Sequence, residues 1–415
     1  MNKVTILTLG CKQNKYESDC MANLLRGNGY EVSEDLCVAD VYIINTCAVT
    51  SEAEKKSRQY VSKCLKLNPQ AKIVICGCAS EKNSKQFEEK SNVFSIIGTE
   101  GKEKILQYIE NSQKEKNDLS LTYESPINPQ KTSTREHIKI QDGCNNFCSY
   151  CIIPYLRGRS RSRDLQSIID EANTIALRSK EIVLTGIDIS SFKVDGKPAL
   201  PLLMSKLKDV NALIRLGSLE VNVITEELMQ VLKSMPNFAP QFHLSLQSGD
   251  DEVLKKMNRH YTSEEFLEKV NLIRKYFPLA NITTDVIVGF AGETEKQFEN
   301  TKEFIKKVGF SFVHIFPYSR REGTRAYTFE DLPLSVKKAR VDILEEVNKE
   351  VKANYLKNFV ETTGTMLVEE KKTYYEGFSP EYIRCYLDAN DIKTGEIYKI
   401  KFIEPYLDGM KVELI

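Results

Sequence analysis

The chain has 415 residues, 41% of them hydrophobic, which is enough for two or three ordinary domains and argues against disorder. Its 58 basic and 58 acidic side chains balance, so the net charge neither indicates nor excludes a nucleic-acid partner. The first residues lack a signal-peptide pattern, and no apolar run reaches the roughly 18 residues of a membrane span, so we expect a cytoplasmic protein without a membrane partner.

Apolar strands and amphipathic helices alternate over the first hundred residues. Strands are expected at 4–10, 40–46, 72–77 and 94–99, with helices at 17–29 and 51–67. This βαβ rhythm is typical of a parallel sheet and predicts an α/β domain over residues 1–112. The following stretch, 113–136, is polar, contains two prolines and has no sustained apolar period, so it is predicted to be a linker.

A second series of strands fills the middle of the chain, separated mostly by helical patterns. These strands are expected at 138–143, 181–186, 213–219, 241–247, 281–290 and 312–318. Six βα units predict a partial (β/α)6 barrel of the TIM type over residues 137–355, with the functional site at the carboxyl ends of its strands.

The last part of the chain changes character after a long charged helix, expected at about 335–359. Short β-rich runs separated by turn residues follow, at 365–372, 382–388, 397–405 and 411–415. They predict a small antiparallel β-barrel over residues 356–415.

Eleven cysteines are numerous for a chain expected in a reducing compartment, where they more often bind metals or act in catalysis than form disulfides. Cys144, Cys148 and Cys151 have the spacing C-x3-C-x2-C directly after the first strand of the predicted barrel. Three thiolates bind three irons of a 4Fe-4S cluster and leave the fourth iron open, as a catalytic site requires. A zinc site is the alternative, but zinc usually needs four ligands or histidines, and His137 lies before the strand.

This motif resembles that of the radical S-adenosylmethionine superfamily. The resemblance implies that the open iron is chelated by the methionine moiety, that one electron from the cluster yields a 5′-deoxyadenosyl radical, and that Tyr150 lies beside the adenine. Further candidates for the cosubstrate pocket follow the predicted strands: Gly186, Asp188, Glu220, Gln247 and Asp285. Their alternative roles are ordinary turns and helix caps.

Three other cysteines, Cys11, Cys47 and Cys78, each follow an apolar strand of the N-terminal domain. Because parallel strands end at one edge of a sheet, these thiols are predicted to share a second cluster there. Cys78 is preferred to Cys76, which still lies within its strand. The alternative is that they are buried core thiols, and that role is expected for the remaining cysteines: Cys20, Cys37, Cys64 and Cys385.

Together these features resemble the methylthiotransferase family over essentially the whole chain. The resemblance implies that the N-terminal cysteines hold an auxiliary 4Fe-4S cluster whose open iron carries the sulfur, and that a TRAM module at the end of the chain grips the substrate. It also implies two uses of S-adenosylmethionine, one as the methyl donor to the sulfur and one as the radical source.

The branches of this family act on isopentenyladenosine in tRNA, on threonylcarbamoyladenosine in tRNA, or on an aspartate of a ribosomal protein. The segments TLGCKQNKYES and QDGCNNFCSYCIIPYLRGRSRSR are most similar to the threonylcarbamoyladenosine branch, which implies methylthiolation of C2 of adenosine 37. Ala291 stands where the family usually has proline, and EGFSPEYIRCYL is a loose TRAM signature. A non-catalytic iron–sulfur RNA-binding protein is the alternative of another class.

Basic residues give separate support for an RNA substrate. Four arginines recur at every second position, so in an extended segment all four would face one side and suit phosphates: Arg157, Arg159, Arg161 and Arg163. Lys371, Lys372 and Arg384 of the last domain are further candidates, with Lys399 and Lys401, and with Tyr374, Tyr375 and Tyr382 for stacking. Pairing with carboxylates is the alternative for the arginines. The expected partners are tRNA, a sulfur donor and an electron donor, and no DNA.

Overall fold

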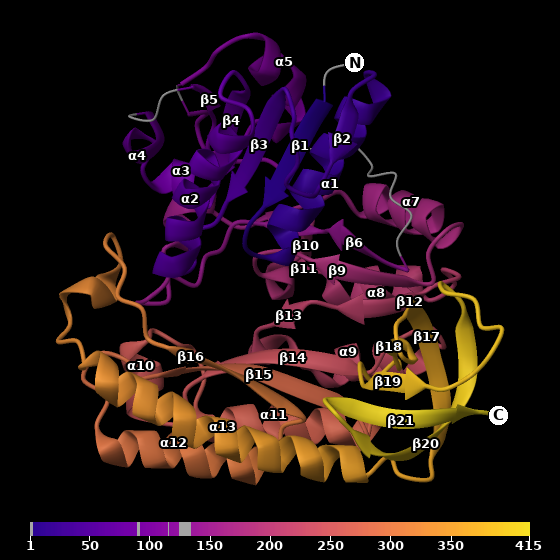
Figure 1. Cartoon of the computed structure of the whole chain (residues 1–415). Coiled ribbons are helices and arrows are strands. Elements are labelled where there is room, and N and C mark those ends of the chain that lie inside the picture. Colours follow the sequence, from indigo (N-terminus) through magenta and orange to yellow (C-terminus); the bar gives the residue numbers. More distant parts are fainter. Residues whose placement is uncertain (1–2, 89–91, 115, 124–133) are drawn as a thin grey trace.

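The computed structural model describes residues 3–88, 92–114, 116–123 and 134–415. Figure 1 shows an N-terminal α/β unit above a central layer of strands and helices, with a small barrel at the carboxyl end of the chain. Within the predicted linker 113–136, residues 115 and 124–133 lie outside the described part. None of the described helices is both long and apolar enough to cross a bilayer.

The N-terminal unit is a parallel sheet in the order β2-β1-β3-β4-β5. Its strands are β1 (Lys3–Thr8), β2 (Glu31–Ser33), β3 (Val41–Thr46), β4 (Lys72–Gly77) and β5 (Val93–Ile96), and its helices are α1 (Lys12–Gly27), α2 (Ser51–Leu67), α3 (Cys78–Lys82), α4 (Lys85–Glu88) and α5 (Ile105–Glu110). Separate apolar clusters pack on the two faces of the sheet, which is why its central strands are apolar throughout. The expected parallel α/β domain is confirmed, and β2 was missed because it has only three residues, two of them polar and none buried.

Six parallel strands form the central unit, in the order in which they occur in the chain. They are β6 (Arg135–Lys139), β9 (Glu181–Thr185), β12 (Leu213–Leu216) continued by β13 (Ser218–Leu219), β14 (Gln241–Gln247), β15 (Asn281–Val288) and β16 (Phe312–Pro317). The interruption falls at Gly217, where a Cβ atom would lie 2.8 Å from the carbonyl oxygen of Leu184. The predicted partial barrel is therefore confirmed.

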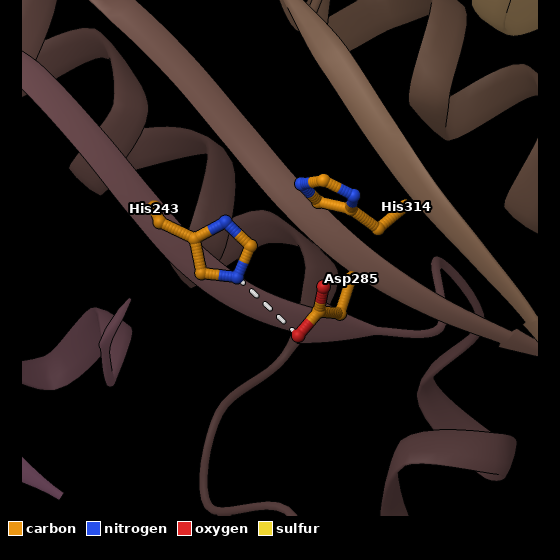
Figure 2. A group of neighbouring side chains, drawn as sticks. All are labelled: His243, Asp285 and His314. Carbon is orange, nitrogen blue, oxygen red and sulfur yellow. Dashed lines mark ion pairs between the residues drawn. The ribbon is translucent and has the colours of Figure 1, made fainter. Parts of the chain in front are cut away.

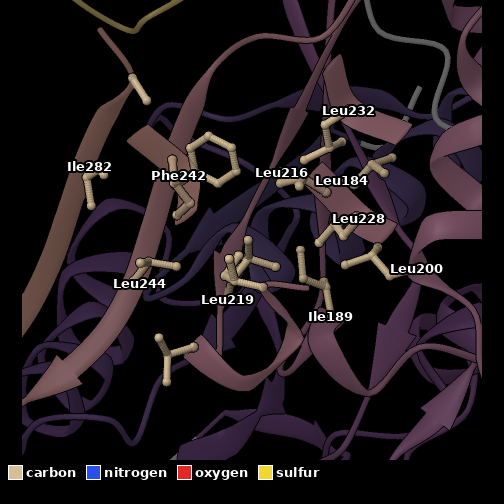
Figure 3. Packing of buried hydrophobic residues seen from close by; sticks show 14 of the residues in the cluster. Leu184, Ile189, Leu200, Leu216, Leu219, Leu228, Leu232, Phe242, Leu244 and Ile282 are labelled. Carbon is tan, nitrogen blue, oxygen red and sulfur yellow. The ribbon is translucent and has the colours of Figure 1, made fainter. Parts of the chain in front are cut away.

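Helices cover the outside of this curved sheet. They are α7 (Leu165–Ala176), α8 (Leu200–Leu207), α9 (Glu226–Ser234), α10 (Asp251–Lys256), α11 (Ser263–Tyr276), α12 (Glu295–Val308) and α13 (Leu334–Lys357), the last matching the predicted long helix. Thr262 and Thr294 begin α11 and α12 with capping boxes. Figure 3 shows Leu184 and Leu216 of the strands in one cluster with Leu228 and Leu232 of α9.

The C-terminal unit is a closed five-stranded barrel in the order β17-β18-β19-β21-β20, as predicted. Its strands are β17 (Thr363–Lys371), β18 (Tyr375–Phe378), β19 (Arg384–Leu387), β20 (Ile397–Tyr406) and β21 (Gly409–Leu414).

A buried carboxylate joins the C-terminal barrel to the central sheet. Glu181 of β9 accepts hydrogen bonds from Arg135 at 2.7 Å and from Arg215 at 2.6 Å. Both guanidinium groups lie over the ring of Tyr382, and Arg215 also donates to the carbonyl oxygen of Pro380. We call these four side chains, Arg135, Glu181, Arg215 and Tyr382, the barrel joint.

Candidate active site

The first cysteine motif occupies a loop that is closed at its base by a short antiparallel ladder between β7 (Gln141–Asp142) and β8 (Arg161–Ser162). Gly143 begins the loop with φ +69, and a Cβ atom there would lie 2.0 Å from the carbonyl oxygen of Arg159. The loop is held from within by a bond from the amide of Cys151 to the carbonyl of Cys148 at 2.9 Å. Its shape therefore depends on backbone contacts as much as on the thiols.

Of the thiols of this loop, Cys148 is buried and Cys144 and Cys151 are partly buried. Loss of contact with water, with a smaller contribution from the neighbouring thiols, raises the pKa of Cys144 and of Cys151 to about 12. Thiolates in these surroundings are stable only beside a cation, and iron supplies that charge. Three thiols in one loop fit a 4Fe-4S cluster with an open iron, because three thiolates bind three of its four irons.

Arg259, on the turn after α10, contacts the three-cysteine loop. Its Nη1 atom donates to Sγ of Cys148 at 3.1 Å, and its Nη2 atom pairs with Glu220 and donates to the carbonyl oxygen of Ser245. Asn258, which directly precedes Arg259, donates hydrogen bonds to the carbonyl oxygens of Asn146 and Phe147. Nothing in the local sequence distinguishes this arginine, and sequence reasoning missed it.

The second set of cysteines lies at the carboxyl edge of the N-terminal sheet, where the adjacent strands β1, β3 and β4 end. Cys11 precedes α1, Cys47 follows β3, and Cys78 is the first residue of α3. A Cβ atom on Gly10 would lie 2.7 Å from Sγ of Cys47, so only glycine lets the first loop approach the second. Cys76, by contrast, is a fully buried residue within β4.

The three thiols of this edge also act on one another electrostatically. Burial, with a smaller contribution from Cys78 and Cys11, raises the pKa of Cys47 to about 11. The pKa of Cys78 is raised by burial, and Arg157 opposes that shift. The buried side chain of Gln13, two residues after Cys11, has no hydrogen-bond partner among the described residues. Three convergent thiols beside an unpartnered amide and a guanidinium fit a negatively charged cluster.

The predicted arginine strip is wrong for three of its four members. Arg157 ends α6 (Ile153–Arg157), and it, Arg161 and Arg163 are buried. Their carboxylate partners are Glu17 and Asp142 for the first, Glu100 for the second and Glu171 for the third. These arginines bind carboxylates, not phosphates. The segment turns at Gly158 with φ +72, so the alternation expected of an extended strand does not hold.

Arg159 alone of the four is exposed, and its guanidinium lies 4.5 Å from the ring centroid of Phe147. It remains a proposed RNA contact.

The five polar or glycine residues proposed for the cosubstrate, together with Tyr150, are spread over several places. Asp188 and Glu220 line a hollow of about 510 Å³, together with Arg259. Burial, and to a smaller extent the nearby carboxylate of Glu220, raises the pKa of Asp188 to about 6. Gly186 and Asp285 line a different, larger cavity. Gln247 is buried at the end of β14, and Tyr150 packs edge-on against Phe290.

The larger cavity, of about 830 Å³, lies where all three units meet, and we call it the main cavity. Cys11 and Lys12 line it from the N-terminal unit, His243 and Asp285 from the central sheet, and Tyr382 from the C-terminal barrel. Its size is that of a pocket for a small organic molecule. The second cysteine site therefore opens into a hollow within the barrel.

Figure 2 shows His243, Asp285 and His314 gathered on the wall of the main cavity, from the neighbouring strands β14, β15 and β16. His243 Nε2 lies 3.3 Å from Oδ2 of Asp285, and its Nδ1 lies 2.9 Å from Oγ1 of Thr283. Sequence reasoning missed both histidines. The polar alternation of His243, Ser245 and Gln247 along a strand was a usable signal, because alternate residues share one face.

The basic candidates of the C-terminal barrel are mostly engaged within the chain. Lys372 pairs with Glu370, Arg384 with Glu376 and Asp408, and Lys401 with Glu361. Lys371 lies over the ring of Tyr375, which is itself buried. Tyr382 stacks on Phe378, while Tyr374 packs edge-on with Tyr386 and Tyr406. Their exposed groups, with Lys399, remain proposals for RNA contact.

Comparison with known proteins matches residues 138–305 to the radical SAM superfamily and residues 3–98 to the uncharacterized protein family UPF0004. Threonylcarbamoyladenosine tRNA methylthiotransferase MtaB of Bacillus subtilis is 35% identical, covering 100% of this chain and 97% of the relative. The protein of the same name from Aquifex aeolicus is 37% identical over 91% of this chain and 95% of its own length. A tRNA-2-methylthio-N(6)-dimethylallyladenosine synthase of Clostridium novyi is 36% identical over 88% and 85%.

Among solved structures, the radical S-adenosylmethionine methyltransferase TsrM of Kitasatospora setae superimposes with a TM-score of 0.57 at 15% identity. The superposition covers 78% of this chain and 77% of that chain, and it establishes a shared fold.

Proposed function

The chain belongs to the family of radical S-adenosylmethionine tRNA methylthiotransferases, and on that premise we propose that it inserts a methylthio group at C2 of N6-threonylcarbamoyladenosine 37 of tRNA. Relatives named for this reaction match essentially the whole chain, which includes both cysteine sites and the C-terminal barrel. The observation that carries the proposal is the opening of the Cys11 site into the main cavity, inside the barrel that bears the three-cysteine loop.

Two sets of residues hold the cofactors in this proposal. Cys144, Cys148 and Cys151 bind one 4Fe-4S cluster, and Cys11, Cys47 and Cys78 bind the other. When bound, the clusters supply the electron for cleavage of S-adenosylmethionine and the site for the sulfur. Asp188, Glu220 and Arg259 offer two carboxylates and a guanidinium around the 510 Å³ hollow, which suit the ribose, amino and carboxylate groups of S-adenosylmethionine.

The protein around the main cavity positions the substrate and excludes water. Gly186 leaves room at the end of β9, because a Cβ atom there would lie 2.9 Å from both the carbonyl oxygen of Gln141 and Cγ2 of Ile189. The walls come from all three units, so an adenosine in the cavity is enclosed on several sides. Enclosure protects a reactive radical from side reactions.

Methylthiolation of dimethylallyladenosine in tRNA is the second candidate, because a relative of that name is 36% identical over most of this chain. The two substrates differ in the group on N6, which is charged in threonylcarbamoyladenosine and apolar in dimethylallyladenosine. The chemistry of the main cavity therefore separates the two candidates.

Mass spectrometry of tRNA nucleosides tests the proposal. The reconstituted protein is incubated anaerobically with tRNA, S-adenosylmethionine, a reductant and sulfide, and the nucleosides are compared before and after. We expect threonylcarbamoyladenosine to convert to its 2-methylthio derivative, while tRNA carrying dimethylallyladenosine stays unchanged. Conversion of dimethylallyladenosine alone would select the second candidate, and cleavage of S-adenosylmethionine without a new nucleoside would refute both.

The partners of the enzyme are tRNA, a protein or small molecule that donates sulfur, and an electron donor for the clusters. We place this activity in the cytoplasm.

A further inference from the structure

The main cavity holds three cationic side chains with unused bonding capacity. Lys12, directly after Cys11, has no ion pair or hydrogen bond to any described residue. Arg215 lines the same cavity, so Lys12 adds a second positive charge to its wall. An arrangement of this kind is unfavourable until an anion enters.

Arg215 is the second of these cations. It is 2% exposed, and its Nε and Nη1 atoms are used by Glu181 and by the carbonyl oxygen of Pro380. Its Nη2 atom is buried without a hydrogen-bond partner among the described residues. A buried donor left unpaired costs about 1–3 kcal/mol, so its presence in a cavity wall indicates a ligand that accepts its hydrogen bond.

Lys352 of α13 is the third cation, and it lines the same cavity. Its Nζ atom lies 5.6 Å from the ring centroid of Phe312, and no described carboxylate is within ion-pair distance. Phe312 in turn packs edge-on against His314. The lysine, the aromatic ring and the histidine pair thus form one continuous wall.

His243, Asp285 and His314 have the side-chain types of a metal site, and their possible ligand atoms lie within 4.8 Å of one another. Both ring nitrogens of His243 already have partners in Thr283 and Asp285. Burial lowers the pKa of His314, and His243 and Lys12 lower it further, although Asp285 opposes them. A divalent cation would meet this same positive surrounding, so the wall suits a neutral polar group beside an anion.

From this arrangement we propose that Lys12, Arg215 and Lys352 bind the carboxylate of the threonylcarbamoyl group, and that His243, Asp285 and His314 face its hydroxyl and urea groups. The inference rests on the proposed function and assigns the specificity of the same site. A dimethylallyl group offers no charge to these cations and would leave both lysines and Nη2 of Arg215 without a partner, so the cavity discriminates against it.

Binding measurements with three RNAs test this assignment. The full chain with both clusters reconstituted is titrated, by fluorescence anisotropy, with an anticodon stem–loop carrying threonylcarbamoyladenosine, its methyl ester, or unmodified adenosine. We expect the wild-type protein to bind the free acid about tenfold more tightly than the ester, since charge-assisted hydrogen bonds are worth on this order. Lys352→Gln and Lys12→Gln should each lose most of that preference and leave binding of the ester unchanged.

Matched controls come from the same helices. Lys349→Gln, one turn from Lys352, and Lys15→Gln, one turn from Lys12, remove exposed or partly exposed lysines that pair with acidic side chains at the surface, and both should keep the wild-type preference. Iron content and the visible spectrum report whether Lys12→Gln disturbs the neighbouring Cys11. If it does, Lys352→Gln decides the outcome, because Lys352 lies on α13 and not on the N-terminal helix that follows Cys11.

Three results would overturn the assignment in distinguishable ways. A wild-type protein that prefers the modified stem–loop but binds acid and ester equally would refute the carboxylate contact and leave the proposed function standing. Variants that weaken all three RNAs to the same extent would show that the lysines contact tRNA phosphates instead. A wild-type protein that does not prefer the modified stem–loop over unmodified adenosine would count against the proposed function as well.

Discussion

Arg157 connects the two cysteine sites through a single side chain. It leaves the three-cysteine loop at the end of α6, reaches Asn14 and Glu17 of α1, and lies beside Cys78. Glu17 is also paired with Lys102 and Lys139, and together these groups form a buried charge network between the N-terminal and central units. Burial alone would raise the pKa of Glu17, yet the cations hold it well below its usual range.

Replacing Arg157 with Met should therefore destabilise the protein. The change leaves Glu17 and Asp142 buried with fewer partners, and breaking a buried pair costs about 3–5 kcal/mol, with the low end expected because Lys102 and Lys139 remain. Urea unfolding followed by circular dichroism measures the loss. Arg159→Ala, at the exposed position, is the control and should change stability by less than about 0.5 kcal/mol. Equal stability of the two variants would contradict the network.

The two cysteine sites are expected to have different roles in the reaction, and these roles can be measured independently of stability. Cys144→Ala should abolish formation of 5′-deoxyadenosine, whereas Cys11→Ala should keep it and lose transfer of the methylthio group. Each variant should lose roughly one cluster's iron, since three thiolates are needed to hold a cluster. Cys76→Ala is the matched control within the strand that ends at Cys78, and it should keep both iron contents. Loss of 5′-deoxyadenosine in Cys11→Ala would contradict the separation.

Single residues also show what the sequence can and cannot predict. The cysteines were predictable because their chemistry depends on spacing and on position after a strand, both of which are local. The arginines were not, because Glu17 and Glu100 come from another unit and meet Arg157 and Arg161 only after folding. Charge pairing over such sequence distances leaves no local pattern.

At the scale of elements, the turn between β15 and α12 explains the unusual residue at position 291. The amide of Glu293 donates to the carbonyl oxygen of Phe290 at 2.8 Å, and Gly292 has φ +71. These are the features of a type II turn, in which proline is favoured at the second position and glycine at the third. Ala291 occupies the proline position, and its own amide has no acceptor among the described residues.

Ala291→Pro should accordingly stabilise the protein by about 0.4–1 kcal/mol, because proline restricts the unfolded chain at a position whose folded conformation it already fits. The urea midpoint measures the gain, with Ala291→Ser as a control that restricts nothing. A lower midpoint for the proline variant would mean that its ring collides with the buried Phe290 and Met257 cluster around it.

Some strands of the chain could be predicted from the sequence and others could not. Long apolar strands such as β3 and β15 were predictable from composition, as was the barrel that they build. The break between β12 and β13 was not, since it depends on the contact of Gly217 with the neighbouring Leu184, which only the assembled sheet brings together. For the same reason the cosubstrate residues were predicted as one set of strand ends, whereas Asp188 and Glu220 line one hollow and Gly186 and Asp285 another. Gln247 and Tyr150 are not in the lining of either hollow.

At the scale of the whole molecule, the barrel joint makes the union of two units depend on pH. Arg215 and Arg135 hold the pKa of Glu181 at about 2 against the opposing effect of burial, compared with 4.5 in the unfolded chain. A depressed carboxylate pKa contributes stability that is complete above the unfolded value and is lost as the pH falls through the folded one. Glu181 therefore contributes about 3 kcal/mol at neutral pH, and this contribution disappears between about pH 5 and pH 2.

Urea midpoints measured between pH 7 and pH 3 should fall more steeply for the wild-type protein than for Glu181→Gln. The variant is less stable at neutral pH but has lost this titration. The chain contains no tryptophan, so circular dichroism is the suitable probe. Parallel pH profiles for the two proteins would show that the joint does not hold this charge.

The buried charge network has a consequence for how such enzymes diversify. Its acids and bases are divided between two units, since Glu17 and Lys102 belong to the N-terminal unit and Arg157, Lys139 and Asp142 belong to the central one. A chimera that takes its sulfur-carrying half from one relative and its radical barrel from another would place unmatched charges against each other in a dry interface. We therefore expect recombination between relatives to give a folded protein only when both sides of the network come from the same relative. The two halves should then share one evolutionary history.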